Sequence, residues 1–205
     1  MTQGTAPLLD AGLMMRYESA LRGQTVPVDE WRKPPLADGE RAHVLAKLGL
    51  DLPIEGEVWW GWHDGAIGDG RRKLFGPYQE CLSLEGAVAQ FRQSRSIAER
   101  IAADSPPPLD DPDRAWDPAW LPIKGEGHPV VIDCSVGPGQ SSPVRFIDWQ
   151  NVDGFRIPQA PSLGRMILWW TEALESGAWR WDNNETAWRV EEDLLDPNFR
   201  ATDLT

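Results

Sequence analysis

A chain of 205 residues with 41% hydrophobic residues is long enough for one packed domain and short for two. Its net charge of −12 disfavours nucleic acid and anionic membranes as partners and favours a basic protein, although acidity can also serve solubility alone. No stretch approaches the ~18 apolar residues of a membrane span.

The two cysteines, Cys81 and Cys134, lie far apart in apolar stretches, which predicts buried thiols and no disulfide framework. Residues 1–15 lack the basic and apolar regions of a signal peptide. We therefore expect a cytoplasmic protein.

Three helices are predicted in the first third of the chain. The first spans 8–22, where apolar residues recur every four positions. The second spans about 39–48, with Asp38 as its N-cap and Gly49 in the left-handed conformation that ends many helices. The third begins at Pro53, because a missing N–H costs nothing at the first helical position.

The third helix is expected to end at Asp64-Gly65, and Ser83 is expected to cap a fourth over 84–103. Residues 105–118 are rich in proline and aspartate. They are predicted to form a loop or semi-rigid spacer that connects two parts of one domain.

Strands dominate the next segment, at 120–124, 129–134 and 144–149. Their short connections favour an antiparallel meander, and Pro122 indicates an edge or bulge position. Ser162 is expected to cap a last helix over 163–176.

Residues 179–181 and 186–190 are predicted to form a closing hairpin, followed by a frayed tail from 194. Together these elements predict an α+β fold. Its sheet is expected to be central, antiparallel or mixed, with about 4–6 strands and helices packed around it.

The order of these motifs is similar to that of a known family. Leu52-Pro53 leads through an apolar helix to Trp62-His63-Asp64-Gly65, and Trp120-Leu121-Pro122-Ile123 precedes a glycine hairpin and Val131-Ile132-Asp133. A strand at 144–148 and a helix with Leu163 and Trp169-Trp170 follow. This pattern resembles the SUKH superfamily, which includes fungal cell-wall assembly regulators and many bacterial immunity proteins.

The resemblance covers about 36–179 of a single domain expected over 1–205, with the helix at 8–22 before it and the hairpin and tail at 180–205 after it. It implies a sheet with helices packed around it and a role in binding. In bacterial relatives the partner is often a secreted toxin, commonly a nuclease, and other relatives are regulatory scaffolds.

Candidate catalytic and metal-binding residues are few. The three histidines, His43, His63 and His128, have no metal-ligand spacing. His63 is interpreted as a partly exposed cap residue in preference to a catalytic base. The aspartates of the 105–118 segment are interpreted as a solvated loop in preference to a divalent-ion site, and Cys134 as a core residue in preference to a nucleophile.

The twelve tryptophans divide between the core and an expected interface. Trp62, Trp120 and Trp170 fit apolar stripes of the core. Six others are too many for one small core, so some should be exposed and anchor a partner, although half-burial under loops is equally favoured for any one. These six are Trp59, Trp60, Trp169, Trp179, Trp181 and Trp188.

We expect a non-catalytic protein-binding module, above all an immunity protein that neutralises a secreted toxin by direct binding. A nuclease is one example of such a toxin. The partner is expected to be a protein with a basic surface, and the chain a monomer or weak homodimer. No nucleic acid, membrane, metal or cofactor is expected. The expected contact residues lie at helix ends and hairpins: Trp59, Trp60, His63, Asp64, Glu126, His128, Asp148 and Trp149.

Two alternatives stay open. One is a regulatory scaffold of the cell-wall assembly regulator type. A gene that stands alone would favour this role, whereas a gene beside a toxin gene would favour immunity. The other is a hydrolase or metal-dependent enzyme that uses His63, Asp64 and Asp133.

Overall fold

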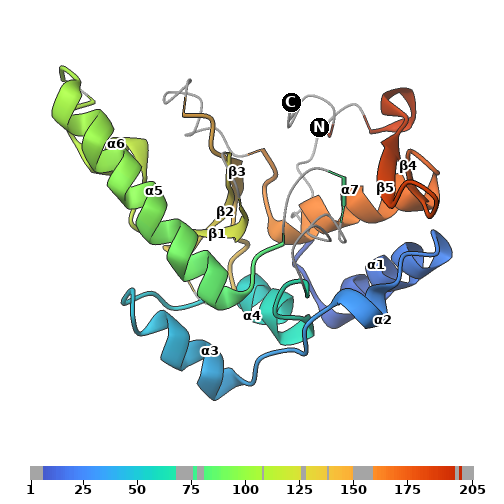
Figure 1. The fold of residues 1–205 in the computed structure, drawn as a ribbon. Coiled ribbons are helices and arrows are strands. Elements are labelled where there is room, and N and C mark those ends of the chain that lie inside the picture. The colour runs from blue at the N-terminus through green and yellow to red at the C-terminus, as the bar shows by residue number, and fades with distance from the viewer. Residues whose placement is uncertain are drawn as a thin grey trace.

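The computed structural model describes residues 7–67, 76–77, 81–107, 109–125, 128–137, 139–149, 159–196 and 199. Over these residues the fold is α+β, as predicted (Figure 1). The elements in chain order are α1 (Ala11–Gly23), α2 (Val28–Trp31), α3 (Asp38–Leu45), α4 (Ile54–Trp62), α5 (Leu84–Asp104), α6 (Pro112–Ala115), β1 (Trp120–Lys124), β2 (Val130–Asp133), β3 (Val144–Phe146), α7 (Leu163–Glu175), β4 (Trp179–Asp182), β5 (Ala187–Val190) and the 3₁₀ helix η2 (Glu192–Leu194).

The antiparallel meander is confirmed, with strand order β1-β2-β3. Trp120 pairs with Asp133, and Val131 pairs with Arg145 on the other side of β2. The register shifts between Pro122 and Lys124, where a proline cannot donate to the ladder. The irregularity predicted from Pro122 is therefore present in β1.

The prediction of a central sheet with 4–6 strands is wrong for the part of the chain that the structure describes. Three strands form one antiparallel sheet, and β4 and β5 form a separate hairpin of two strands. The hairpin packs on helices instead of on a sheet edge, because Trp179 of β4 contacts Trp170 of α7 at 6.2 Å between ring centroids. Among the described residues, the larger sheet is extended only by isolated bridges, from Cys81 to Lys124 and from Val144 to Ala160.

Helix ends agree closely with the predictions. Ser83 and Ser162 accept the expected N-cap hydrogen bonds of α5 and α7. Gly49 and Gly65 have φ of 67° and 75°, a region that favours glycine. Pro53 is the N-cap of α4 and not its first helical residue, a shift of one position.

Other boundaries differ from the predictions, since α1 begins at Ala11 and not at residue 8, and α3 ends at Leu45 and not at residue 48. Ala37, not Asp38, is the N-cap of α3, because the Glu40 carboxylate accepts the Ala37 N–H at 2.8 Å and draws the start of the helix back by one residue. The proline- and aspartate-rich segment is not all loop: Asp111 caps the short helix α6 by accepting the Asp113 N–H at 3.0 Å.

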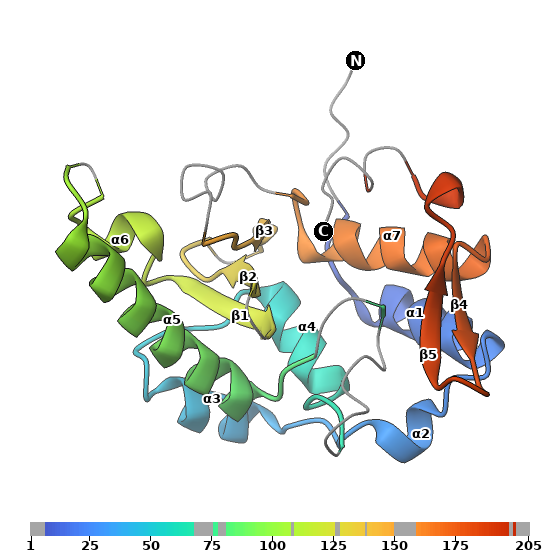
Figure 2. The ribbon, with the colours of Figure 1, turned by 45° about the horizontal axis from the view of Figure 1, so that its top comes forward.

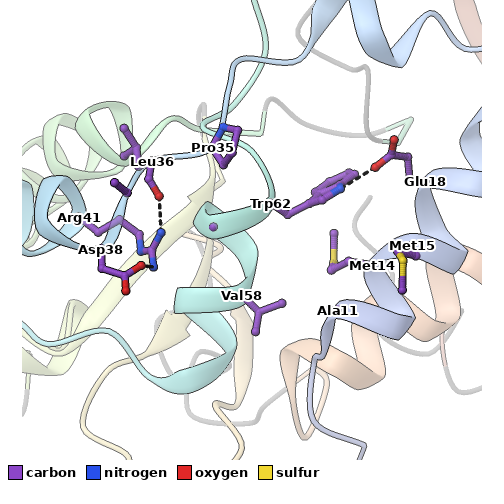
Figure 3. Close-up of a pocket in the computed structure, with 12 residues that line it drawn as sticks. Ala11, Met14, Met15, Glu18, Pro35, Leu36, Asp38, Arg41, Val58 and Trp62 are labelled. Atoms are coloured by element: carbon purple, nitrogen blue, oxygen red, sulfur yellow. Dashed lines mark hydrogen bonds and ion pairs between the residues drawn. The ribbon is translucent and has the colours of Figure 1, made fainter.

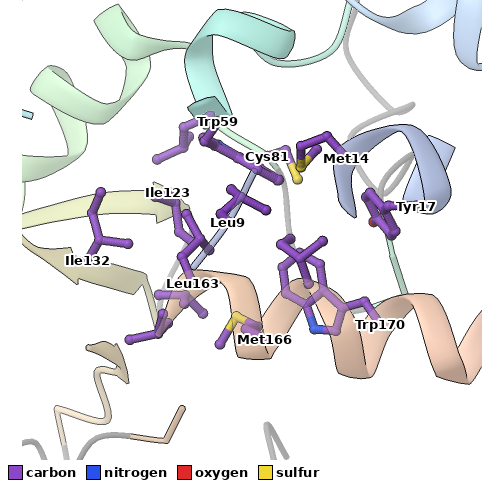
Figure 4. Close-up of a cluster of buried hydrophobic side chains, with 14 of the residues drawn as sticks. Leu9, Met14, Tyr17, Trp59, Cys81, Ile123, Ile132, Leu163, Met166 and Trp170 are labelled. Carbon is purple, nitrogen blue, oxygen red and sulfur yellow. The ribbon is translucent and has the colours of Figure 1, made fainter. Parts of the chain in front are cut away.

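The three-stranded sheet is covered on both faces (Figure 2). Val130 and Ile132 of β2 belong to the larger apolar cluster with α1, α4 and α7, whereas Val131 between them points into a smaller cluster with α5 and α6. Alternate residues of a strand face opposite sides, which explains this division. Figure 4 shows side chains from α1, α4, β1, β2 and α7 meeting in the larger cluster.

The two clusters together accommodate the tryptophans, and the expectation that some are exposed is wrong. Trp59, Trp60 and Trp179 are fully buried. Trp169, Trp181 and Trp188 are half-buried. A second cluster around Trp116 and Trp120, beneath α5 and α6, provides the additional interior that one small core would lack.

A buried carboxylate joins three distant segments. Glu55 of α4 has no exposed surface. Its Oε1 accepts the N–H groups of Leu9 at 2.9 Å and Gly164 at 2.7 Å, and its Oε2 accepts the N–H of Ser142 at 2.6 Å. Hydrogen bonds to a charged acceptor are stronger than those between neutral groups, so this carboxylate fixes α4 against the segment before α1, the segment before β3 and the first turn of α7.

None of the helices described here is both long and apolar enough to cross a membrane.

Candidate functional site

An open groove of about 670 Å³ lies between α1 and α4, and the exposed side chain of Met15 stands on its wall (Figure 3). We call it the α1–α4 groove. Its lining residues come from α1, α4, the segment before α3 and α3 itself: Ala11, Met14, Met15, Glu18, Pro35, Leu36, Ala37, Asp38, Arg41, Val58, Gly61 and Trp62.

Both long walls of the groove are helical. On α1 the lining residues recur at three- and four-residue steps, from Ala11 through Met15 to Glu18. On α4, Val58 and Trp62 are one turn apart and face the same way. The 3.6-residue period therefore gives α4 a second apolar stripe beside the one it buries in the core, and α1 adds Ala11 and the exposed Met15 on the facing wall.

Apolar side chains continue the groove beyond its lining. Among the described residues, five large hydrophobic side chains are exposed, and Met15 is the most exposed of them at 67%. Ile54, also exposed, lies one turn before Val58 on α4. Leu8 is a third exposed apolar residue. The hydrogen bond from the Leu9 N–H to Glu55 places the segment that contains Leu8 beside the first turn of α4.

The α3 end of the groove carries carboxylates on its rim. Arg41 donates to Glu57 Oε2 at 2.6 Å, to Asp38 Oδ1 at 2.6 Å and to the carbonyl of Leu36. The Arg41 side chain is only 7% exposed, whereas those of Asp38 and Glu57 are 97% and 43% exposed. A partner at this rim would therefore contact the exposed carboxylates of Asp38 and Glu57, while the Arg41 guanidinium that pairs with them is nearly buried.

At the other end, Glu18 fixes the indole of Trp62, a half-buried wall of the groove. Glu18 Oε2 accepts Trp62 Nε1 at 2.7 Å and Arg32 Nη1 at 2.9 Å, and Oε1 accepts Arg22 Nη2 at 2.6 Å. Partial burial raises the pKa of Glu18, but the hydrogen bonds from Arg22 and Trp62 and the charge of Arg32 outweigh it and hold the pKa below its usual value. The carboxylate therefore stays ionised and holds the ring in place.

Three of the predicted contact residues have no exposed surface. Trp59, Trp60 and His63 are fully buried, so in this structure they belong to the core and not to a binding surface. His63 is the C-cap of α4, as the sequence predicts, but it is buried and not partly exposed. Its ring lies 4.8 Å from that of Trp59 and 4.4 Å from that of Trp62.

Asp64 is half-buried and accepts the Leu84 N–H at 2.7 Å, which ties the end of α4 to the first turn of α5. Glu126 lies outside the described residues. Asp64 is therefore a structural carboxylate, and the role of Glu126 stays a prediction.

His128, Asp148 and Trp149 come together at one end of the three-stranded sheet. His128 is exposed, with Nδ1 3.8 Å from Asp148 Oδ1 and its ring 5.6 Å from that of Phe146. Trp149 is half-buried and stacks on Trp116 at 5.9 Å. Of the predicted contact residues, these three form the one group that the structure brings together with exposed surface.

The residues of the enzymatic alternative have structural contacts. Asp133 Oδ1 accepts the N–H of Ser135 at 2.9 Å and its hydroxyl at 2.5 Å, the local backbone bonding expected for this position. Burial raises the pKa of Cys134 to about 12, so its thiol is protonated at neutral pH. Within the described ranges, no group of three His, Cys, Asp or Glu side chains is placed to hold a metal ion.

His63 makes stability depend on pH. Burial lowers its pKa from 6.5 to about 3, and its Nδ1 accepts the Gly65 N–H at 3.1 Å. The unfolded chain binds a proton that the folded chain excludes, so this contribution is complete above pH 6.5 and is lost as pH falls toward 3. We expect stability to drop by about 1.4 kcal/mol per pH unit from this residue within that window.

Urea unfolding at several pH values between 7 and 4 measures this effect. His63→Gln should show a shallower loss of stability with falling pH than the wild type. His43→Gln, at an exposed position, should keep the wild-type slope. Equal slopes in all three proteins would show that folding does not lower the pKa of His63.

Comparison with known proteins assigns no family, because no family model matches the chain and no similar curated protein was found.

Proposed function

We propose that this chain is a non-catalytic, protein-binding module of the SUKH type, and that it acts as an immunity protein that neutralises a toxin domain by direct binding. The observation that carries the proposal is the α1–α4 groove. It combines an open apolar hollow, the exposed Met15 and an acidic rim on a chain of net charge −12.

Contiguous exposed apolar surface with a polar rim is typical of protein interaction sites. Methionine and tryptophan suit such a site, because methionine adapts its shape and tryptophan supplies a rigid apolar face. The groove supplies both, in Met15 and in a Trp62 ring held by Glu18.

The negative charge indicates the chemistry of the partner. An acidic rim raises the rate of association with a basic protein and disfavours an acidic one. Toxin domains that act on nucleic acids need basic surfaces, because they contact phosphates. Occluding such a surface requires complementary shape and charge and no catalytic group.

Affinity capture with the tagged full chain in its native cells, followed by mass spectrometry, tests the proposal. We expect one basic protein in stoichiometric amount, which arrests growth when expressed alone and is harmless when this chain is co-expressed. Recovery of no specific protein would overturn the proposal. A captured protein whose activity this chain leaves unchanged would also overturn the immunity role and favour the regulatory alternative.

A further inference from the structure

We infer that the α1–α4 groove binds a basic, amphipathic α-helix of the protein partner. The inference rests on the proposed function and names the element that the groove recognises. It follows from the shape of the walls, the length of the apolar strip and the charge of the rim.

The walls favour a helix over an extended segment. Two helices form them, and their lining residues stand in rows with three- and four-residue steps. Such rows are the ridges and grooves into which the side chains of another helix pack. Ala11 carries only a methyl group, which leaves room on the α1 wall for a helix backbone to approach. An extended strand would need unpaired backbone groups at a sheet edge, and two helices offer none.

The length of the apolar strip sets the length of contact. Ile54, Val58 and Trp62 occupy successive turns of α4, and eight residues of helix span about 12 Å. Met15 stands on the opposite wall. A bound helix of two to three turns would therefore place apolar residues at positions i, i+4 and i+7 against this strip.

The rim selects the polar face of that helix. Asp38 and Glu57 are exposed while Arg41, which pairs with both, is nearly buried. Lys or Arg residues flanking the apolar face would meet these carboxylates. A second copy of this chain is a poor occupant, because each copy has a net charge of −12.

The first test uses a defined probe. It is a fluorescent synthetic helix of about five turns with leucine at i, i+4 and i+7 and flanking lysines, and a second peptide carries glutamate in place of lysine. Met15→Glu places a charge on the exposed groove wall, and Leu194→Glu makes the same change at an exposed apolar residue outside the groove lining. Both sites are on the surface, so neither variant should disturb folding.

We expect the lysine peptide to bind the wild type and Leu194→Glu equally, and Met15→Glu about tenfold more weakly, in fluorescence anisotropy. The glutamate peptide should bind at least about tenfold more weakly than the lysine peptide. Equal binding of the lysine peptide to both variants would overturn the inference. So would a dimer of the wild type that Met15→Glu abolishes in sedimentation, because the occupant would then be a second copy.

The second test uses the captured partner and separates this inference from the proposed function. A partner bound by the wild type and about tenfold more weakly by Met15→Glu supports both. A partner that Met15→Glu binds as tightly as the wild type overturns the groove as the site and leaves the protein-binding function intact. Failure of the wild type to recover any partner overturns the proposed function, whatever the peptide does.

Discussion

Glu55→Gln is expected to lower the free energy of unfolding by about 3 kcal/mol. Glutamine has nearly the shape of glutamate, but it replaces one carboxylate oxygen by an NH₂ group. Three backbone N–H groups converge on the Glu55 carboxylate, from Leu9, Ser142 and Gly164. An amide can accept from one side only, so at least one N–H would face another donor in a site without solvent.

Urea unfolding at neutral pH measures this loss as a lower midpoint with an unchanged slope. Glu57→Gln, two residues along α4, is the matched control. It removes a partly exposed ion pair, and Arg41 keeps its bonds to Asp38 and Leu36, so we expect a loss below about 1 kcal/mol. Equal losses in the two variants would show that the three-way connection adds no stability beyond an ordinary surface carboxylate.

Gly164→Ala is expected to lower the free energy of unfolding by about 2–4 kcal/mol, although alanine is the better helix former. A Cβ at this position would lie 2.4 Å from the Pro7 carbonyl oxygen and 2.5 Å from Leu9 N. Both are backbone atoms that cannot turn aside as a flexible side chain would. The segment before α1 or the start of α7 must therefore move, and the bonds to Glu55 move with it.

Thermal unfolding followed by circular dichroism compares this variant with Gly39→Ala. Gly39 is also in the first turn of a helix, but a Cβ there meets nothing within 4 Å. The same substitution at Gly39 should therefore raise stability by about 0.5 kcal/mol. A neutral or stabilising Gly164→Ala would mean that the N-terminal segment does not pack on α7 in solution.

The elements themselves could be predicted because their signals are local. Ser83 and Ser162 identify two helix starts, and Gly65 and Gly177 have the positive φ that a glycine permits after a helix. The short connections between the three strand segments were enough for the meander. Each of these features depends on neighbours within a few residues.

Their arrangement could not be predicted, because it depends on contacts between distant residues. Nothing in the local pattern shows that β4 and β5 pack on helices instead of joining the sheet. Lys124 is another example, since a strand that ends in lysine is expected to expose it. In the structure Lys124 is fully buried, with Nζ 4.5 Å from the centre of the Trp170 ring.

None of the predicted contact residues lines the α1–α4 groove. The expectation of an acidic, aromatic-bearing surface led to Trp59 and Trp60, which are buried, while the neighbouring Trp62, assigned to the core, lines the groove. On a helix of nine residues that carries three tryptophans, more than one face is apolar, so periodicity does not identify the exposed one. The steps from Ala11 to Met15 and from Ile54 to Val58 were the available signal for the groove.

The packing of the C-terminal hairpin has a consequence for local unfolding. A hairpin of two strands is only marginally stable in water, and its amides should exchange rapidly with solvent. Here Trp179 is buried against Trp170, and Trp181 meets Trp31 of α2 at 5.7 Å between ring centroids. Opening β4 from β5 would expose these rings together. We therefore expect the hairpin amides to exchange with solvent as slowly as those of the main core, and the hairpin not to fray as a separate unit.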